Sequence, residues 1–441
     1  MPTTVAVIGG GISGLASAVR IAGLGHRVTL FEASETLGGL GATFPVADTH
    51  LERFYHCILP SDRALLAHIE ELGLSNQLVW RRSRMGFTYR GRAYSLNTAA
   101  DLLRFTPLTL VERLRLGLMG IRTRFAGCDE RLDLVTAESW LRSMTGDRAF
   151  DVLWKPLLSA KIGDQYPALP ALWLSSRMHR EKNAGPERKG FLTGGYRSLI
   201  AAFEHRIMSR GGRVRLGTRV DRVEQVDGGM DVVLTAGDRE GYDYVVVTSP
   251  LSAFQALTRT LSIPESIRTL ELDYQGVLSA VFLTDRPLTE FYWMPFVESG
   301  TTAQGIIAMS NLVPLERVHG LHVNYLVNYT HRDSPLFQRD EADLLAAYRA
   351  DIAKMFPNAA DSIRDQYLFR APFVEPIWTL NYRRLKPPAS IIPGRLYLAC
   401  TAQHYPQVNS WNSCCDVVDS MMARVVAETA ALPSRGEPAL A

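Results

Sequence analysis

The chain has 441 residues, 46% of them hydrophobic and 21% charged, with 34 glycines and 23 prolines. This composition excludes a disordered, collagen-like or coiled-coil chain, and the length is enough for two or three domains with large cores. The 48 basic and 45 acidic residues give a net charge of +3, so bulk charge does not support nucleic-acid binding.

The five cysteines form no C-x-x-C pair and no set with histidines at zinc-ligand spacing, so we expect no metal site. An odd number of cysteines without a secretion signal is typical of reduced thiols, and we expect a cytoplasmic protein. The apolar opening from Val5 to Val19 is interrupted by glycines and lacks the basic start of a signal peptide. No membrane-spanning segment is predicted.

The first elements follow one another in an informative order. Residues 4–8 form an apolar, β-branched run that predicts a strand buried on both faces. A glycine-rich turn follows, and apolar residues then recur at helical spacing until the glycines near residue 24. Residues 26–31 predict a second strand, which ends at Glu32. This order of strand, glycine turn, helix, strand and acid predicts a dinucleotide site.

Each glycine of this turn has a distinct use. Gly9 permits the tight turn, Gly11 lets the backbone approach a pyrophosphate, and Gly14 lets the helix pack closely on the strand. The free N–H groups and positive dipole end of the helix favour the same anion. The Glu32 carboxylate can accept the ribose hydroxyls. The predicted contacts of this region are Gly9, Gly11, Ile12, Ser13, Gly14 and Glu32.

A second pair of glycines, Gly38 and Gly39, follows the acid. The run from Glu32 to Thr43 resembles the E-A-x-x-x-x-G-G extension of the FAD-containing amine oxidase superfamily. That superfamily includes monoamine oxidase, protoporphyrinogen oxidase, phytoene desaturase and, more distantly, UDP-galactopyranose mutase. The resemblance implies FAD as the cofactor. It adds as cofactor contacts Ala33, Gly38, Gly39, Leu40 and Thr43.

Later segments are also similar to that superfamily. Residues 213–216, 220–226 and 230–234 alternate in polarity and predict a small antiparallel meander. The resemblance implies that Val220 holds the adenine end through its backbone. It also implies that residues 394–401 deliver a turn to the ribityl chain, and that a helix from about 414 to 429 points at the flavin ring. The cofactor contacts expected here are Val220, Thr401, Trp411 and Asn412.

The fold class implied is α/β, with a Rossmann-like FAD-binding domain of the glutathione-reductase type built from discontinuous segments. We assign residues 1–50, 189–255 and 390–430 to this domain. An α+β substrate domain with a mixed sheet takes residues 51–188 and 256–389, and its helical lid takes about 98–180.

The sequence departs from the superfamily pattern at two places. Cys400-Thr401 stands where a Gly-Asp pair is usual, and a polar and aromatic loop follows at 402–413. This loop resembles a bacterial branch of flavoproteins associated with sugars. The predicted strand 276–283 contains no lysine, although amine oxidases commonly place one there to hold a water near flavin N5. Simple amine oxidation is therefore disfavoured.

The candidates for chemistry lie beside the expected flavin. We predict catalytic roles for His56 and Tyr405, because histidine and tyrosine can move protons. We predict substrate contacts for Tyr55, His404 and Asn409. The alternative for Tyr55 and His56 is a packed, hydrogen-bonded aromatic pair, which is the more common role for such residues.

Two charged segments each have two interpretations. Residues 98–125 mix leucines with five arginines, which fits a membrane-surface helix or a lid with its apolar face in the core. We favour the lid, because amphipathic helices mostly pack on their own domain. The second segment is a group of basic residues near residue 161. These residues either bind an anionic substrate or form a solvated surface, and we favour the solvated surface. That group is Lys161, Arg177, Arg180 and Lys182.

The function expected from the resemblance is an FAD-dependent oxidoreductase that takes a hydride from a small organic substrate at flavin N5. The alternatives are a non-redox flavoenzyme, such as a sugar isomerase similar to UDP-galactopyranose mutase, and a flavin-stabilised binding protein without turnover. The expected partner is a small molecule, anionic or lipidic, without nucleic acid. The protein is expected in the cytoplasm, free or at a membrane surface.

Overall fold

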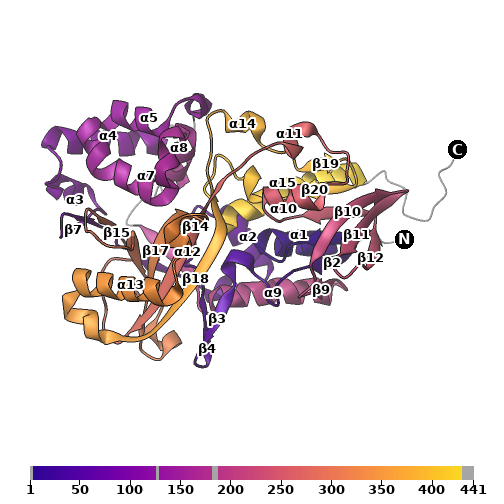
Figure 1. Cartoon of the computed structure of the whole chain (residues 1–441), viewed down its shortest axis with the longest axis horizontal. Coiled ribbons are helices and arrows are strands. Elements are labelled where there is room, and N and C mark those ends of the chain that lie inside the picture. Colours follow the sequence, from indigo (N-terminus) through magenta and orange to yellow (C-terminus); the bar gives the residue numbers. More distant parts are fainter. Residues whose placement is uncertain (1–2, 126–128, 181–186, 430–441) are drawn as a thin grey trace.

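The computed structural model describes residues 3–125, 129–180 and 187–429. Two sheets lie side by side along the long axis of the molecule, and a group of helices covers the end that is far from both termini (Figure 1). This arrangement confirms the predicted α/β class with a Rossmann-like sheet and a second, mixed sheet. The division into domains at residues 50, 188, 255 and 389 stays a prediction.

The first sheet has six strands in the order β19-β20-β13-β1-β2-β9. All neighbours pair in parallel except β19 with β20. Residues 5–8 are buried, as expected for a strand covered on both faces. The strands are β1 (Thr4–Ile8), β2 (Arg27–Phe31), β9 (Arg213–Arg215), β13 (Tyr244–Val247), β19 (Ser390–Ile392) and β20 (Leu396–Leu398).

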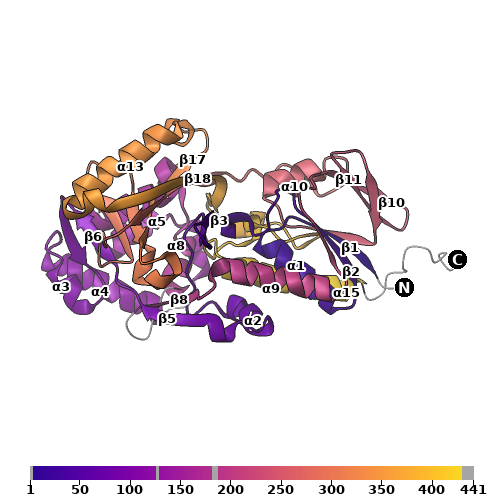
Figure 2. The same cartoon turned by 90° about the horizontal axis from the view of Figure 1, so that it is seen from below.

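Different layers cover the two faces of this sheet (Figure 2). Helices α1 (Ile12–Gly23), α9 (Gly195–Ser209) and α15 (Trp411–Thr429) pack on one face. The other face carries β10 (Val220–Val226), β11 (Gly229–Leu234), β12 (Arg239–Tyr242) and α10 (Leu251–Leu257).

The prediction that residues 213–216 belong to the meander is wrong, because residues 213–215 join another sheet. They form β9, which pairs with β2 in the parallel sheet, and β12 takes the third place in the meander. The local alternation of polar and apolar residues was correct for a strand. Its partner is remote in sequence, and alternation carries no information about which strand lies alongside.

The second sheet has seven strands in the order β18-β14-β17-β16-β15-β6-β7. It is mixed, because β15 pairs with β6 in parallel and the other neighbours are antiparallel. Every residue of β14 is buried, and none is a lysine. The strands are β6 (Gly86–Tyr89), β7 (Arg92–Ser95), β14 (Tyr274–Thr284), β15 (Trp293–Val297), β16 (Gly305–Ala308), β17 (His322–His331) and β18 (Ile363–Pro376). Helices α12 (Pro335–Gln338) and α13 (Glu341–Met355) pack on one face.

The cap is the group of helices between residues 99 and 180. Its members are α3 (Ala99–Arg104), α4 (Leu110–Phe125), α5 (Ala137–Thr145), α6 (Asp147–Ala149), α7 (Lys155–Ile162) and α8 (Ala171–Arg180). Their shared core includes Met119, Leu141, Phe150 and Trp173, together with Trp378 from the segment after β18. The remaining elements are hairpin β3 (Thr43–Val46) and β4 (Thr49–Glu52), the pair β5 (Leu78–Arg82) and β8 (Arg188–Leu192), and helices α2 (Arg63–Glu71), α11 (Glu265–Arg268) and α14 (Tyr382–Leu385).

Candidate active site

The first glycine turn lies between β1 and α1. Gly9 has a φ of 110°, and a β-carbon added to Gly14 would lie 1.8 Å from the carbonyl oxygen of Gly9. Strand and helix therefore meet too closely for a side chain at Gly14. Helix α1 begins after Gly11 without a side-chain cap, so its first N–H groups are available to an anion.

The second glycine turn lies against the first. The Gly38 N–H donates to the carbonyl oxygen of Gly10 at 2.8 Å, and Gly11 and Gly38 form a parallel β-bridge. A β-carbon on Gly39 would lie 3.2 Å from the Cα of Gly11, and one on Gly11 would lie 4.0 Å from the Cα of Gly39. The two turns thus form a cradle of bare backbone that any side chain would fill. We call this pair of turns the glycine cradle. Bare backbone at the start of a helix is the kind of site that binds phosphate groups.

Glu32 follows β2 and is fixed beside the cradle. Its Oε2 accepts a hydrogen bond from the Gly10 N–H at 2.6 Å. Its Oε1 accepts bonds from the Ser34 N–H at 2.8 Å and the Ser34 hydroxyl at 2.7 Å. A carboxylate held at this point can accept ribose hydroxyls and repels a 2′-phosphate, as a flavin dinucleotide requires.

The start of α15 lies next to the second glycine turn. A β-carbon on Gly41 would lie 2.0 Å from Cζ2 of Trp411, so the indole packs directly on the turn. The Asn412 amide oxygen accepts from the Leu65 N–H at 3.2 Å, and its amide nitrogen donates to Asp416 at 2.9 Å. Trp411 is therefore close to the glycine cradle, whereas the side chain of Asn412 supports the start of α2.

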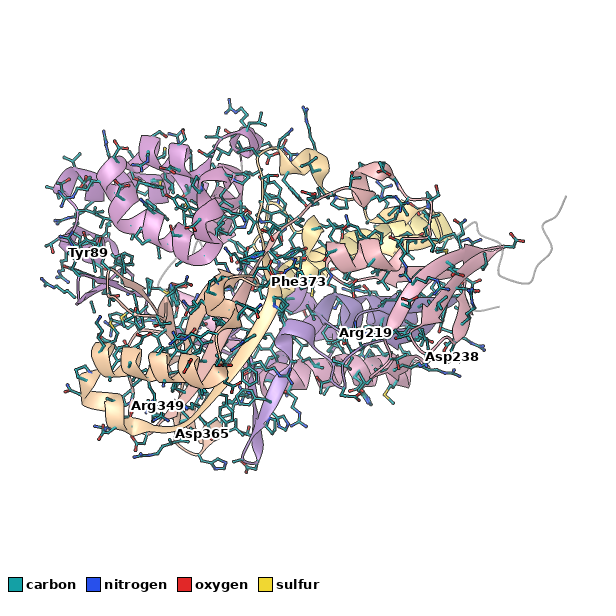
Figure 3. The ribbon with its side chains drawn as sticks, in the orientation of Figure 1. Tyr89, Arg219, Asp238, Arg349, Asp365 and Phe373 are labelled. Carbon is teal, nitrogen blue, oxygen red and sulfur yellow. The ribbon has the colours of Figure 1, made fainter. Side chains whose placement is uncertain are left out.

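The other predicted cofactor residues lie on several elements. Thr401 follows β20, and its hydroxyl lies 2.9 Å from the Tyr274 hydroxyl. The Tyr274 ring meets Phe373 edge to face, and Figure 3 labels Phe373 at the junction of the two halves. Val220 begins β10, an edge strand of the meander, directly after the labelled Arg219. Ala33 follows Glu32, Leu40 lies in the turn Gly39–Gly41, and Thr43 begins β3.

His56 lies in the segment that follows β4. Its Nδ1 is 2.7 Å from the carbonyl oxygen of Phe54, so Nδ1 carries a proton and donates it. Burial lowers the pKa of His56, and the imidazole is neutral with Nε2 as an acceptor. The ring centroid lies 5.1 Å from that of Tyr196 and 5.8 Å from that of Trp411. His56 is thus both a packed aromatic residue and a neutral base beside α15.

Tyr55 joins a polar cluster built from four segments. Its hydroxyl lies 2.8 Å from the hydroxyl of Tyr329 on β17. The Lys161 ammonium, from α7 of the cap, lies 3.7 Å from the centroid of the Tyr329 ring and 2.9 Å from Oε2 of Glu375 on β18. Glu375 Oε1 is buried without a hydrogen-bond partner in the described structure. We call these four residues the junction cluster.

The electrostatics of the junction cluster keep both phenols protonated. Burial raises the pKa of Tyr329 to about 12, and it raises the pKa of Tyr55 well above the usual value. The charges of Lys161 and Arg177 act in the opposite direction on Tyr55. The two tyrosines are therefore neutral hydrogen-bonding groups close to positive charge.

The cationic group predicted near residue 161 is divided by the structure. Lys161 is in the junction cluster, and the charge of Arg177 reaches Tyr55 and Tyr329. Arg180 instead forms an ion pair with buried Asp62 at 2.8 Å, which ties α8 to α2. Lys182 lies outside the described residues.

The loop after β20 holds the last three candidates. Both ring nitrogens of His404 are buried and have no hydrogen-bond partner among the described residues. Burial and the charge of Lys386 lower the pKa of His404 to about 3, and the nearby Asn409 amide acts in the opposite direction. The Asn409 side chain donates to the carbonyl oxygen of Val374. His404 is therefore a buried histidine with a neutral imidazole.

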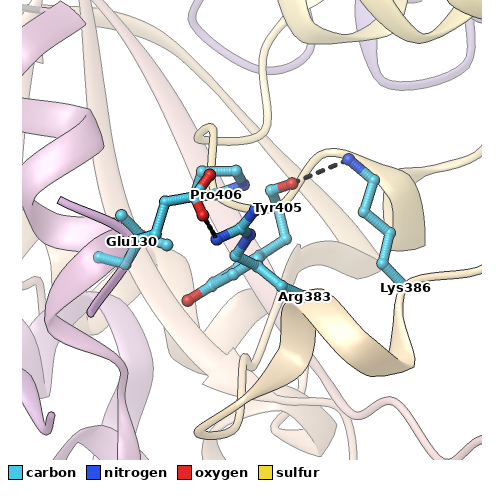
Figure 4. A pocket seen from close by; sticks show the side chains of 6 residues that line it. Glu130, Arg383, Lys386, Tyr405 and Pro406 are labelled. Carbon is cyan, nitrogen blue, oxygen red and sulfur yellow. Dashed lines mark hydrogen bonds and ion pairs between the residues drawn. The ribbon is translucent and has the colours of Figure 1, made fainter. Parts of the chain in front are cut away.

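Tyr405 is held beneath the cap. Its hydroxyl donates to buried Asp133, and its ring packs on Trp378 and Tyr382 at 5.3 and 5.4 Å. It lines a cleft of about 400 Å³ together with Glu130, Leu172, Arg383, Lys386 and Pro406 (Figure 4). Arg383 pairs with Glu130 there, and Lys386 donates to the Tyr405 carbonyl oxygen. These contacts give Tyr405 a packing role between the cap and the loop after β20.

Sequence reasoning missed Tyr329 and Glu375. Glu375 is the one charged residue of the apolar stretch 371–378, and such an isolated acid is a signal of a buried, paired carboxylate. Tyr329 carried no comparable signal, because tyrosines on alternating strand positions are ordinary.

The Rossmann-like sheet, the glycine cradle and Glu32 define a dinucleotide-binding protein with a flavoprotein arrangement. The family of flavin containing amine oxidoreductases matches residues 12–408, and the chain belongs to this family. The family implies a flavin cofactor, which agrees with the resemblance found in the first forty residues.

Two relatives illustrate the range of the family. A Mycobacterium tuberculosis protein described as the flavin-containing monoamine oxidase AofH is 26% identical over 295 residues, which are 63% of this chain and 64% of that protein. The 15-cis-phytoene desaturase of Synechococcus elongatus is 25% identical over 396 residues, or 80% of each chain. The chain thus spans less than two thirds of the length of the mycobacterial relative.

Solved structures share the fold. A protein from Exiguobacterium described as a protoporphyrinogen oxidase has a TM-score of 0.75 at 20% identity, covering 97% of this chain and 99% of that one. Reduced UDP-galactopyranose mutase has a TM-score of 0.73 at 16% identity, covering 95% and 94%. At these identities the likeness establishes the fold alone.

Proposed function

We propose that the protein is an FAD-dependent oxidoreductase that oxidises or desaturates a small organic substrate. The observation that carries this proposal is the glycine cradle with Glu32 fixed beside it, at the edge where the junction cluster and His56 also lie. Bound FAD supplies a two-electron acceptor for a substrate C–H or C–N bond.

The cofactor would be held mainly by backbone. The glycine cradle and the start of α1 would take the pyrophosphate, and Glu32 would take the ribose. Thr401 would contact the ribityl chain, Trp411 would lie near the flavin ring, and Val220 would meet the adenine end through its backbone. The segments 1–50, 189–255 and 390–430 would form the FAD-binding domain, and 51–188 and 256–389 the substrate domain.

The substrate would be oriented by side chains that lie outside the glycine cradle. His56 is neutral and can accept a proton at Nε2, because Nδ1 is committed to Phe54. Tyr55 presents a neutral hydroxyl beside the ion pair of Lys161 with Glu375 and near the charge of Arg177, and it would hydrogen-bond a polar or anionic group of the substrate. His404 and Asn409 would line the substrate site together with Tyr55 and His56. We assign Tyr405 a structural role, because its hydroxyl donates to buried Asp133.

A sugar isomerase is the second candidate, and the likeness to reduced UDP-galactopyranose mutase supports it at the level of fold only. The absence of a lysine from β14 is compatible with either chemistry. The two functions differ in one measurable respect: an oxidoreductase transfers electrons to or from its substrate, and an isomerase returns a product of unchanged oxidation state.

The test is anaerobic mixing of the flavin-loaded protein with amines, tetrapyrrole precursors, alcohols and polyenes, with and without an anionic group. We expect one class to bleach the visible flavin absorbance, and oxygen or another acceptor to restore it. Conversion of a sugar nucleotide by the reduced protein, with no compound bleaching the oxidised one, would establish the isomerase instead.

For location, we propose a cytoplasmic protein whose cap, through residues 98–125, contacts a membrane surface. No helix among residues 3–125, 129–180 and 187–429 is long and apolar enough to cross a membrane. Any membrane contact of the described part would therefore be peripheral.

A further inference from the structure

Helix α4 presents a row of large apolar side chains to solvent. Leu110, Leu114, Leu118 and Ile121 follow one another at helical spacing on one face, with Val111 beside them. Of the thirteen large hydrophobic side chains exposed in the described structure, six lie between residues 103 and 121. Their exposed fractions are Leu103 49%, Leu110 59%, Val111 63%, Leu114 58%, Leu118 65% and Ile121 59%. We call these six residues the α3–α4 apolar patch.

The packing of α4 on the cap leaves this patch uncovered. The opposite face of the helix buries Leu116, Met119 and Thr123 against the cap. The favoured sequence interpretation, a lid with its apolar face in the core, is therefore correct for Met119 and wrong for Leu114 and Leu118. Helix α4 has two apolar faces. One packs in the core of the protein, and the other is exposed to solvent. Solvent-exposed apolar clusters of this kind mark interaction surfaces.

The charges around the patch are mainly positive. Residues 99–125 contain five arginines and two acids. The acids are Asp101 and Glu112, and each caps the start of its own helix, Asp101 through Thr98 and Glu112 through Thr109. Arg104, Arg115 and Arg122 are exposed, and the described structure contains no ion pair for any of them. The patch thus offers leucines at its centre and unpaired guanidinium groups at its rim.

We propose that the α3–α4 apolar patch docks on the surface of a membrane that contains anionic lipids. The leucines would enter the boundary between head groups and acyl chains, and the arginines would bind lipid phosphates. The patch lies on the outer side of the cap, at the end of the molecule opposite both termini (Figure 1). Docking there leaves the six-stranded sheet and the meander away from the lipid.

Charge distinguishes this partner from a second copy of the chain. A twofold contact through the patch would place the arginine rim of one copy against that of the other. Repulsion between the two arginine rims, without acids to neutralise it, opposes association of two copies. An anionic lipid surface would instead attract the same arginines. The proposal does not depend on the redox function, since it uses no residue of the glycine cradle or the junction cluster.

The test is cosedimentation of the flavin-loaded protein with vesicles of phosphatidylcholine alone or with added phosphatidylglycerol. We expect binding to the anionic vesicles that weakens at high salt. The double variant Leu114→Asn with Leu118→Asn should lose about tenfold or more in binding, and so should Arg115→Glu with Arg122→Glu. Retained flavin absorbance and unchanged thermal unfolding would show that each variant is folded.

The matched control is Leu24→Asn with Leu385→Asn, two leucines that are similarly exposed outside the patch, at 47% and 48%. This control should bind as the unchanged protein does. Equal binding of all variants, or no binding to anionic vesicles, would overturn the proposal. A dimer in solution that the leucine variants convert to monomer, without vesicle binding, would assign the patch to a second copy. Loss of substrate oxidation in any assay leaves these outcomes unaffected, so the two proposals fail separately.

Discussion

The candidate active site draws on the glycine cradle and the junction cluster, and these two groups are built in opposite ways. The cradle comes from the first forty residues, and its working surface is backbone from which side chains are absent. The junction cluster comes from the segment after β4, from α7, from β17 and from β18, and its working surface is made of side chains.

This difference predicts how each region responds to change. Where two segments of bare backbone are in close contact, as at Gly14, one added carbon forces an element to move. A side-chain cluster can lose or exchange members, at a cost that depends on what is left unpaired. The cofactor side should therefore fail on single small substitutions, and the substrate side should show compensation between partners.

The largest effect is expected for Gly14→Ala. The added methyl group would lie 1.8 Å from the Gly9 carbonyl oxygen, so α1 must move away from β1 and the glycine cradle opens. We expect protein without flavin, measured by visible absorbance after purification and after addition of FAD. The control is Gly120→Ala, where the added carbon meets nothing within 4 Å and flavin content should be unchanged. Full flavin content in Gly14→Ala would contradict the geometry of the cradle.

The next effect is expected for Lys161→Met, which leaves Glu375 buried without its ion-pair partner. Breaking a buried pair in this way costs about 3–5 kcal/mol in the free energy of unfolding. Adding Glu375→Leu should recover most of that loss, because an apolar pair replaces the ions. Denaturant titration of the two single variants and the double variant measures the coupling. Strictly additive effects would show that the two side chains do not act as a pair.

A smaller effect is expected for Glu32→Gln on cofactor affinity. The amide keeps one acceptor oxygen but loses the charge that would accept the ribose hydroxyls, and hydrogen bonds to a charged group contribute about 1.5–3 kcal/mol. FAD titration of the apoprotein by fluorescence measures the change as a weaker dissociation constant. Glu35→Gln, an exposed acid on the same loop, is the control and should bind FAD normally. Equal affinities for the two variants would remove Glu32 from the cofactor site.

The effect of His404 comes last because it is absent at neutral pH and appears only on acidification. Its pKa in the folded protein is about 3, against about 6.5 in an unfolded chain. Above pH 6.5 both states are neutral and His404 contributes nothing. As pH falls from 6.5 towards 3, the unfolded state binds a proton that the folded state does not. The free energy of unfolding should then fall by about 1.4 kcal/mol per pH unit from this group.

Denaturant titrations of the protein and of His404→Asn across this pH range measure the contribution. The variant should show a shallower loss of stability on acidification. Parallel curves for the two proteins would mean that His404 is solvated and takes up its proton in the folded state.

The contrast between the two regions also explains what the sequence could predict. Gly9, Gly14 and Glu32 act through neighbours in the same strand, turn and helix, so their spacing alone predicted the cofactor side. Tyr55 could be named from the sequence, but its partners Tyr329 and Glu375 could not. They meet it only because the seven-stranded sheet and the cap fold back over the same edge.

The incorrect predictions have a common reason: the sequence does not show which element each strand or helix packs against. Residues 213–216 were predicted as a strand but assigned to the wrong sheet, because so short a strand carries no register information. Helix α4 was predicted to be amphipathic, but hydrophobic spacing cannot tell a covered face from an uncovered one. The partner of the strand and the covered face of the helix both depend on elements that are remote in sequence.

The measurement that tests the central claim most directly is the flavin stoichiometry of the purified protein, before and after reconstitution with FAD. If the glycine cradle and Glu32 form a dinucleotide site, the protein will bind one FAD per chain, and Gly14→Ala will bind none. A folded protein that takes up no FAD under these conditions would contradict the assignment of the cradle, and with it the proposed redox function.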